Sequence, residues 1–170
     1  MTLEQLLFYA LGTVAVGSGL LVVTRRNPVM SVLALILNFF CLAGLYLTLN
    51  AQFIAVIQII VYAGAIMVLF LFVVMLLNLK DERALMEGLS ARKIVGAGLV
   101  FGLLAQVVYI ILSASDGFPV KNESLAISTG TVEVIGVQLF TAFLFPFEIT
   151  SLLLTAAVVG AVLLAKKKLD

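Results

Sequence analysis

The sequence has no histidine and only one cysteine among its 170 residues. Without histidine there is no bis-histidine haem, no histidine-bound zinc or copper, and no imidazole proton relay. A single cysteine excludes an internal disulfide and a cysteine-bound metal cluster. Charged residues are also scarce, at 11% against about 25% in ordinary soluble domains. We therefore expect a chain that binds no metal or haem of its own.

Apolar residues are correspondingly abundant. They make up 64% of the chain, and the mean hydropathy is +1.27, whereas soluble domains are about 45–50% apolar. The net charge of +1 creates no general attraction for nucleic acid. The length accommodates five membrane helices of about 20 residues each with short loops. The composition therefore predicts an all-α integral membrane protein with five transmembrane helices.

Polar or charged segments divide the apolar runs. The predicted spans, within a single membrane domain of residues 1–170, are about 6–23, 29–49, 53–79, 94–112 and 146–165. The first span lacks the basic start and small-residue cleavage site of a signal peptide, so we expect it to be retained. Pro28 suits the first position of a helix, where its missing N–H costs nothing. The third span would be about 40 Å long against a hydrocarbon core of about 30 Å, so it must tilt, bend or protrude.

The last apolar region is too long for one upright helix, and Pro146 divides it. Residues 134–145 are expected to form a short interfacial helix or a re-entrant segment, and both alternatives stay open. Polar segments occupy residues 80–93 and 113–133.

Basic residues indicate the orientation. Under this topology only Lys121 lies on one side, and nine lie on the other: Arg25, Arg26, Lys80, Arg83, Arg92, Lys93, Lys166, Lys167 and Lys168. Positive charge concentrates in cytoplasmic loops. The N-terminus is therefore predicted outside and the C-terminus in the cytoplasm.

Ionisable side chains at membrane depth mark proton pathways, and the first four spans contain none. The one candidate is Glu148 in the fifth span. Its carboxylate would either cap the first turn of a helix beginning at Pro146 or join a polar, proton-linked network. One glutamate near a membrane edge does not make a pump, so any ion transport must be shared with other chains.

The third span carries the most informative local chemistry. Gln58 and Tyr62 lie one turn apart on one helix face, where they could hold a water or bond to a neighbouring helix. Beside them, Gly64 lies between two alanines and relaxes the backbone. Helix interruptions such as π-bulges tend to occur at functional sites. A hinge is therefore permitted here, and simple close packing remains the alternative.

Several segments resemble chain J of bacterial NADH-quinone oxidoreductase, the counterpart of mitochondrial NADH dehydrogenase subunit 6. They are RNPV at 26–29, FIA at 53–55, QIIVYAGAIMVLF at 58–70 and FEITSLLL at 147–154. The resemblance implies a multi-pass core subunit of respiratory complex I in the bacterial inner membrane. No cofactor would be bound by this chain, because FMN, the iron–sulfur clusters and quinone belong to other parts of the complex. The implied partners are the quinone-chamber subunit, neighbouring small multi-helix subunits and antiporter-like subunits.

The same resemblance implies that the third helix has a π-bulge that converts to α-helix and so makes or breaks a water chain. By carry-over, the hinge residues are Tyr62, Ala63, Gly64, Ala65, Met67 and Val68. The candidates for a polar or proton network, which follow from the residues themselves, are Gln58, Tyr62 and Glu148. The sequence departs from the family at Gln52, where relatives commonly have an acidic residue. A carboxylate function at that end of the helix is therefore not expected.

Three other functions remain open. The chain could be the equivalent subunit of a complex driven by ferredoxin or another donor, because the donor is bound elsewhere. It could be a structural scaffold with a rigid third helix. A cation/proton antiporter is disfavoured by the lack of mid-membrane ionisable residues and of inverted repeats. In every case the isolated chain is expected to have no catalytic activity.

Overall fold

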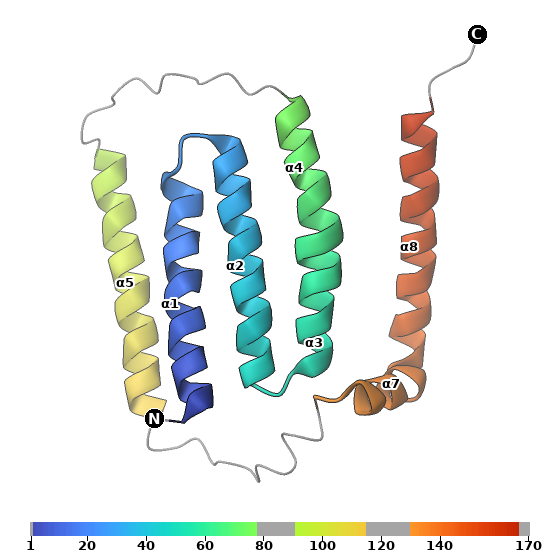
Figure 1. Cartoon of the computed structure of the whole chain (residues 1–170), viewed down its shortest axis with the longest axis horizontal. Helices are drawn as coiled ribbons and strands as arrows, with labels where there is room; N and C mark the ends of the chain where they lie inside the picture. The colour runs from blue at the N-terminus through green and yellow to red at the C-terminus, as the bar shows by residue number, and fades with distance from the viewer. Residues whose placement is uncertain (1, 78–90, 115–129, 167–170) are drawn as a thin grey trace.

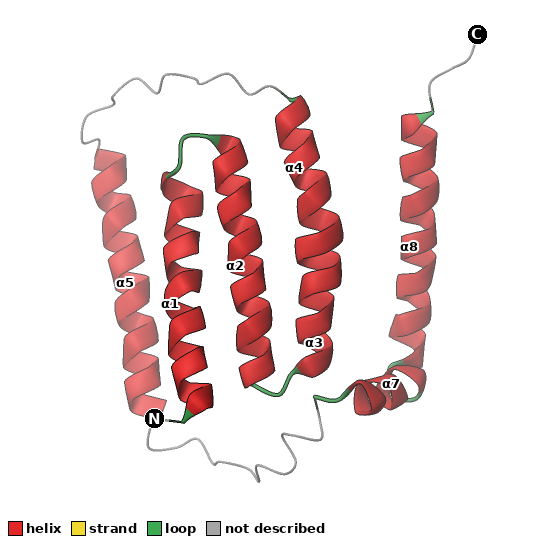
Figure 2. Ribbon diagram, viewed as in Figure 1, coloured by secondary structure: helices red, strands yellow, loops and turns green. Residues whose placement is uncertain are grey.

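The computed structural model describes residues 2–77, 91–114 and 130–166, and all regular secondary structure in these ranges is helical (Figures 1 and 2). The elements are α1 (Leu3–Thr24), α2 (Pro28–Thr48), α3 (Gln52–Ile57), the π-helix η1 (Gln58–Ile66), α4 (Met67–Leu76), α5 (Ala91–Ala114), α7 (Val132–Phe140) and α8 (Leu144–Ala165). The predicted all-α fold is confirmed for the described residues.

Four of the described helical segments are long and apolar enough to cross a membrane. They are α1, α2, the continuous rod formed by α3, η1 and α4, and α8. The apolar part described in α5 is shorter, Gly98–Ser113. The predicted polar segments 80–93 and 113–133 lie mostly outside the described residues. Five of the basic residues counted for the orientation also lie outside them, namely Lys80, Arg83, Lys121, Lys167 and Lys168.

Local sequence explains where the first two helices begin. Thr2 and Gln5 form a capping box, in which each side chain accepts a hydrogen bond from the other residue's backbone N–H. The Asn27 side chain accepts from the N–H groups of Val29 and Met30. Pro28 occupies the first position of α2, as predicted, since that position has no helical partner for an N–H. Both helix starts are therefore satisfied by local side chains.

The turn from α2 into α3 is made by one left-handed residue. Asn50 has a φ of 58°, the only non-glycine residue with positive φ in the described ranges. Its N–H bonds to the Leu47 carbonyl, and the Ala51 N–H bonds to the Tyr46 carbonyl. These two hydrogen bonds form a Schellman motif, and asparagine adopts the left-handed conformation that the motif requires more readily than most residues. The turn thus closes α2 and reverses the chain into the third span.

The packed core consists of α1, α2 and the α3–η1–α4 rod. Its buried apolar residues are mostly small or medium in size: Val32, Cys41, Ala43, Ala55, Ala63, Met67 and Val74. Lipid is as apolar as these side chains, so burial alone does not drive helices together in a membrane. Close backbone approach and interhelical hydrogen bonds must supply the affinity.

One such set of hydrogen bonds joins α1 to α2. The Asn38 amide nitrogen donates to the Ala15 carbonyl at 2.6 Å and to the Ser18 hydroxyl oxygen at 3.1 Å. Ser18, only 3% exposed, in turn donates to the Ala15 carbonyl at 3.0 Å. Nearer the other end of the pair, the Ser31 hydroxyl donates to the Val22 carbonyl. We call the Asn38–Ser18–Ala15 set the polar staple, and it fixes α1 and α2 as one unit.

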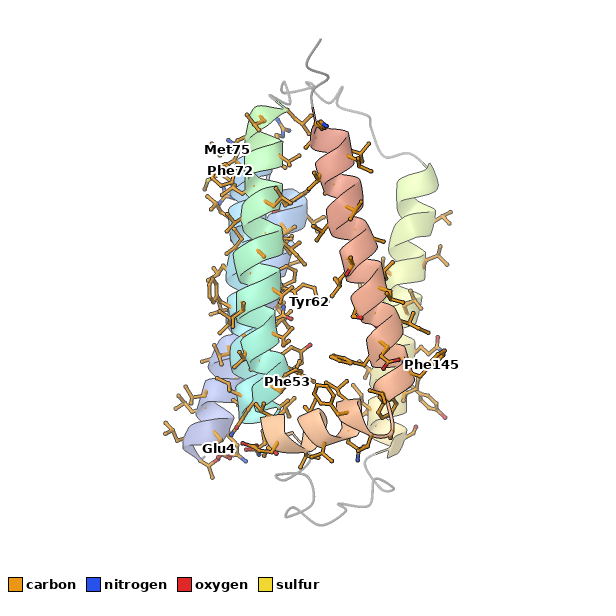
Figure 3. All side chains as sticks on the ribbon, turned by 90° about the vertical axis from the view of Figure 1, so that its right-hand side faces the viewer. Glu4, Phe53, Tyr62, Phe72, Met75 and Phe145 are labelled. Carbon is orange, nitrogen blue, oxygen red and sulfur yellow. The ribbon has the colours of Figure 1, made fainter. Side chains whose placement is uncertain are left out.

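Helices α5 and α8 stand apart from this core. Within the described ranges α5 packs on no other helix, as the turned view shows (Figure 3), and α8 packs only on α7 (Figure 1). Helix α7 lies across the foot of α8 and contacts α3 (Figure 3). The segment before α7 approaches the α2–α3 turn so closely that a Cβ on Gly130 would be 2.3 Å from the Asn50 carbonyl oxygen. Only glycine permits this approach, which connects α7 and α8 to the core.

We predict that Asn38→Leu weakens the α1–α2 pair by about 1 kcal/mol, because it removes both interhelical hydrogen bonds of the polar staple. The free energy of unfolding of the purified chain, measured by titrating detergent micelles with SDS, checks this. Gln106→Leu is the matched control, since Gln106 is an exposed amide in α5 and α5 packs on no described helix. Equal stability of the two variants would contradict the staple.

Candidate functional site

The third span contains the candidate site, and its middle is a π-helix. Residues Gln58–Ile66 have π geometry, with α-helix continuing directly on both sides. Four of the six expected hinge residues, Tyr62–Ala65, lie inside this segment, whereas Met67 and Val68 lie in the first turn of α4. A π-helix pairs each carbonyl with the N–H five residues on, one residue further than in an α-helix. The site is thus a register change within one continuous rod.

At Gly64 the π register leaves little room for a side chain. A Cβ built on Gly64 would lie 3.2 Å from the Ile59 carbonyl oxygen, tighter than an ordinary contact. In the π register that carbonyl is paired with the Gly64 N–H itself. A side chain at this position therefore crowds the π turn. Ala63 beside it is buried, and its small size keeps the rod close to its neighbours.

An aromatic contact joins the π segment to α2. The rings of Phe39 and Tyr62 meet edge to face, with centroids 5.8 Å apart and an interplanar angle of 64°. Such pairs contribute about 0.5–1.5 kcal/mol beyond the area they bury. Phe39 follows Asn38 directly in the sequence. Adjacent residues of α2 therefore contact the two neighbours, Asn38 holding α1 and Phe39 contacting the π segment.

The two polar residues of the third span have different surroundings. Gln58 is 7% exposed, whereas Tyr62 is 45% exposed and lies on the side of the rod toward α8 (Figure 3). In the described part of the chain no hydrogen bond joins their side chains. The predicted Gln58–Tyr62 pair is therefore not bonded directly. Tyr62 presents its ring partly to Phe39 and partly outward.

Glu148 lies in α8, away from the π segment. Its side chain is exposed, and α8 packs on none of the core helices described. The capping interpretation of Glu148 is wrong. Helix α8 begins at Leu144, two residues before Pro146, and its first turn contains no acidic residue. Proline is tolerated throughout the first turn, because N–H groups there have no helical partner.

Sequence reasoning missed Asn38 and Phe39. Asn38 did give a signal, since it is the only amide side chain in the predicted second span. A lone amide in an apolar run is itself typical of interhelical hydrogen bonding. Phe39 gave none, because it is one of 12 phenylalanines in an apolar chain. Among the described residues, no three His, Cys, Asp or Glu side chains gather as metal ligands would.

Comparison with known proteins identifies the class of chain that this sequence resembles. The family of NADH-ubiquinone/plastoquinone oxidoreductase chain 6 matches residues 18–164, which include the whole π segment. NADH-quinone oxidoreductase subunit J of Rhodobacter capsulatus is 38% identical over 167 residues, covering 96% of this chain and 82% of that protein. Subunit J of Buchnera aphidicola subsp. Schizaphis graminum is 34% identical over 164 residues, covering 96% and 99%. NAD(P)H-quinone oxidoreductase chain 6 of Nostoc sp. is 35% identical over 161 residues, covering 95% and 78%.

We predict that Gly64→Ala shifts residues 58–66 from the π toward the α register. The new Cβ crowds the Ile59 carbonyl in the π turn, and alanine favours α-helix over glycine by about 1 kcal/mol. Electron cryo-microscopy of the assembled complex carrying this variant checks the register directly. Gly98→Ala is the control, because a Cβ there meets nothing within 4 Å. An unchanged π turn in Gly64→Ala would show that glycine is not what permits it.

Proposed function

This chain belongs to the NADH-ubiquinone/plastoquinone oxidoreductase chain 6 family and is a membrane subunit of respiratory complex I, and we propose that its π segment is a hinge that helps couple quinone reduction to proton translocation. The hinge comprises Tyr62, Ala63, Gly64 and Ala65 and acts on Met67 and Val68, which follow it. The observation that carries the proposal is the π register itself, held at a glycine in the middle of a membrane span.

A π-to-α change is a discrete conformational step. Moving the register by one residue rotates the helix beyond it by about 100°, because an α-helix advances 3.6 residues per turn. That rotation would carry all of α4 (Met67–Leu76), whose outward side chains include Phe72 and Met75 (Figure 3). Packed elements with two discrete arrangements are suited to switching, since a small local change is amplified along the rod. A water path formed by one face of α4 would be opened or closed by such a step.

The neighbouring helices supply a fixed reference for this rotation. The polar staple holds α1 to α2, so the pair would stay in place as one unit while the rod rotates. The Phe39–Tyr62 contact then lies at the border between the fixed pair and the moving rod. Because Tyr62 is half exposed, its ring and hydroxyl can exchange partners when the register changes. Gln58 is buried at the start of the π segment, where its amide would contribute to a polar network on the same rod.

We infer a non-redox contribution from this chain. Electrons would pass through FMN, iron–sulfur clusters and quinone held by other subunits, and the chain alone would have no catalytic activity. Its own contribution would be conformational. The relatives are named both NADH-quinone and NAD(P)H-quinone oxidoreductases, so the donor is a property of the complex in which the chain sits.

The arrangement in the membrane is inferred from the helices and from the positions of the basic residues. We propose five spans, with α5 as the fourth, in a multi-pass chain of the bacterial inner membrane. Arg25 and Arg26 lie at the α1–α2 turn, and Lys166 follows α8 at the same end of the molecule (Figure 1). Positive charge at this end supports a cytoplasmic C-terminus and an external N-terminus. Helix α7, lying across the foot of α8, would then rest at the outer interface.

The isolated faces of α5 and α8 support contact with other subunits. Within the described residues these helices pack on little of their own chain, so their apolar sides are left for partner helices or lipid. The proposed partners are the quinone-chamber subunit, the neighbouring small multi-helix subunits and the antiporter-like subunits of the complex.

We predict that Gly64→Val lowers quinone reduction and coupled proton pumping by roughly tenfold, because a bulky side chain would disfavour one hinge state by about 1.4 kcal/mol or more. NADH oxidation by an artificial acceptor in the same membrane vesicles should stay nearly unchanged. Tyr62→Phe should lower coupled activity less, since it keeps the ring contact with Phe39 and removes only the hydroxyl. Gly98→Val controls for added bulk in a span. Normal quinone reduction in Gly64→Val would favour a rigid scaffold instead.

The contribution of Glu148 is tested separately. Since its carboxylate does not cap α8, any effect of Glu148→Gln reports a polar or proton-linked network completed by partner subunits. We expect a reduction in pumping of about twofold, smaller than for Gly64→Val, because this exposed carboxylate does not contact the hinge. Proton uptake per NADH oxidised is the measurement, with Glu133→Gln in α7 as the matched control. Identical values for the two variants would remove Glu148 from the network.

A further inference from the structure

A small pocket with both polar and apolar walls lies where α1 begins and α2 ends, outside the hinge. Its volume is about 210 Å³, and its walls are formed by Glu4, Gln5, Phe8, Tyr9, Thr48 and Leu49. The rings of Phe8 and Tyr9 meet edge to face at 5.7 Å. Glu4 is the only charged side chain among the wall residues that the structure describes. The pocket therefore combines one carboxylate with two aromatic rings at the level where the first span starts.

An apolar groove adjoins this pocket along α1. Its volume is about 370 Å³, and it is lined by Phe8, Tyr9, Gly12, Thr13 and Val16. Gly12 forms a notch in this groove, because it has no side chain and the space beside it is open: a Cβ there would meet nothing within 4 Å. The Thr13 hydroxyl donates to the Tyr9 carbonyl at 2.7 Å, so it bonds within its own helix. Pocket and groove share Phe8 and Tyr9 and thus form one continuous surface.

We propose that this surface binds one phospholipid whose headgroup ends in a primary ammonium group, as in phosphatidylethanolamine. The ammonium group lies against the Glu4 carboxylate and the two aromatic rings, and an acyl chain follows the groove past Gly12. Residues 4–16 extend about 18 Å along the helix axis, close to half of a hydrocarbon core of about 30 Å. One leaflet's lipid therefore matches the surface from headgroup to chain.

Charge selects this headgroup. Among the described residues, the wall of the pocket contains a carboxylate and no cationic side chain, and the basic pair Arg25 and Arg26 lies at the opposite end of α1. An anionic headgroup would be repelled by Glu4, whereas an ammonium group donates charge-assisted hydrogen bonds to it. Aromatic rings attract the same cation through their faces.

Hydrogen-bond donors for the lipid phosphate come from side chains in the first two turns of α1. Gln5 uses its amide oxygen in the capping box, which leaves its amide nitrogen as a donor. The Tyr9 hydroxyl is a second donor in the pocket wall. A zwitterionic headgroup is thus matched at both of its charges.

Shape argues against a partner helix as the occupant, because the surface is a pocket continued by a groove along α1. A headgroup is small enough to enter, and a flexible acyl chain can follow a notch that a rigid helix would bridge. The inference is independent of the hinge, which lies on another span.

Photolabelling of the assembled complex tests the site. The complex is placed in nanodiscs containing a trace of phosphatidylethanolamine with a diazirine in its acyl chain, or phosphatidylglycerol with the same chain. After irradiation, trypsin releases residues 1–25 as one peptide, since Arg25 is the first basic residue. Mass spectrometry then measures the labelled fraction. We expect the ethanolamine lipid to label this peptide about fivefold more than the glycerol lipid.

Variants assign the selectivity to the pocket. Glu4→Gln should bring the labelling ratio close to one, whereas Glu133→Gln, a matched change in the first turn of α7, should keep it near fivefold. Gly12→Leu fills the groove without changing charge and should reduce labelling by the ethanolamine lipid. Equal labelling by both lipids in the wild type would show ordinary boundary lipid and overturn the proposal. Labelling by neither would show that another subunit covers this end of α1, and would overturn it equally.

Discussion

In the hydrocarbon region of a bilayer every backbone N–H and C=O must find a partner inside the protein, because lipid offers none. A span can therefore change the partner of each carbonyl, but it cannot leave carbonyls unpaired. The third span satisfies this constraint in two ways along one rod, with α register at both ends and π register from Gln58 to Ile66. A change of register preserves the hydrogen bonding while it alters direction and rotation. This makes a π segment a suitable place for motion within a membrane helix.

The side chains next to Gly64 in the π segment are small. Gly64 lies where a Cβ would crowd the Ile59 carbonyl, and small residues on either side leave room for the wider turn. Helix α2 is held to its two neighbours by different kinds of contact. The Asn38 amide joins α2 to α1 with its hydrogens satisfied, and Phe39 next to it contacts Tyr62. One helix thus contacts α1 through a hydrogen-bonded amide and the π segment through an aromatic ring.

The same chain leaves large apolar surfaces without partners of its own. Helix α8 is connected to the core through α7, and that connection depends on the close approach of Gly130 to the Asn50 carbonyl. A helix held at one end and apolar on its remaining sides is suited to packing between other subunits. The lipid site proposed at the start of α1 fits this picture, since the Glu4 carboxylate is matched by the ammonium group of a small zwitterionic headgroup. Function in this subunit therefore depends on what surrounds it as much as on its own packing.

The sequence by itself determined the helical class and the bounds of the long apolar helices to within a few residues, and it pointed to the glycine-containing stretch in which the π segment lies. These features are local, because bilayer thickness, proline and glycine act on a segment without reference to its neighbours. It also carried the resemblance that led to the family. Only the tertiary structure decided which residues meet: that Asn38 bonds to Ala15 and Ser18, and that Gln58 is buried while Tyr62 is half exposed. It also decided that α8 begins before Pro146, so that Glu148 lies beyond the first turn and does not cap the helix. The reason is that a membrane helix is apolar on all sides, so its pattern does not indicate which face is buried, and rotation about its axis is set by contacts with other helices.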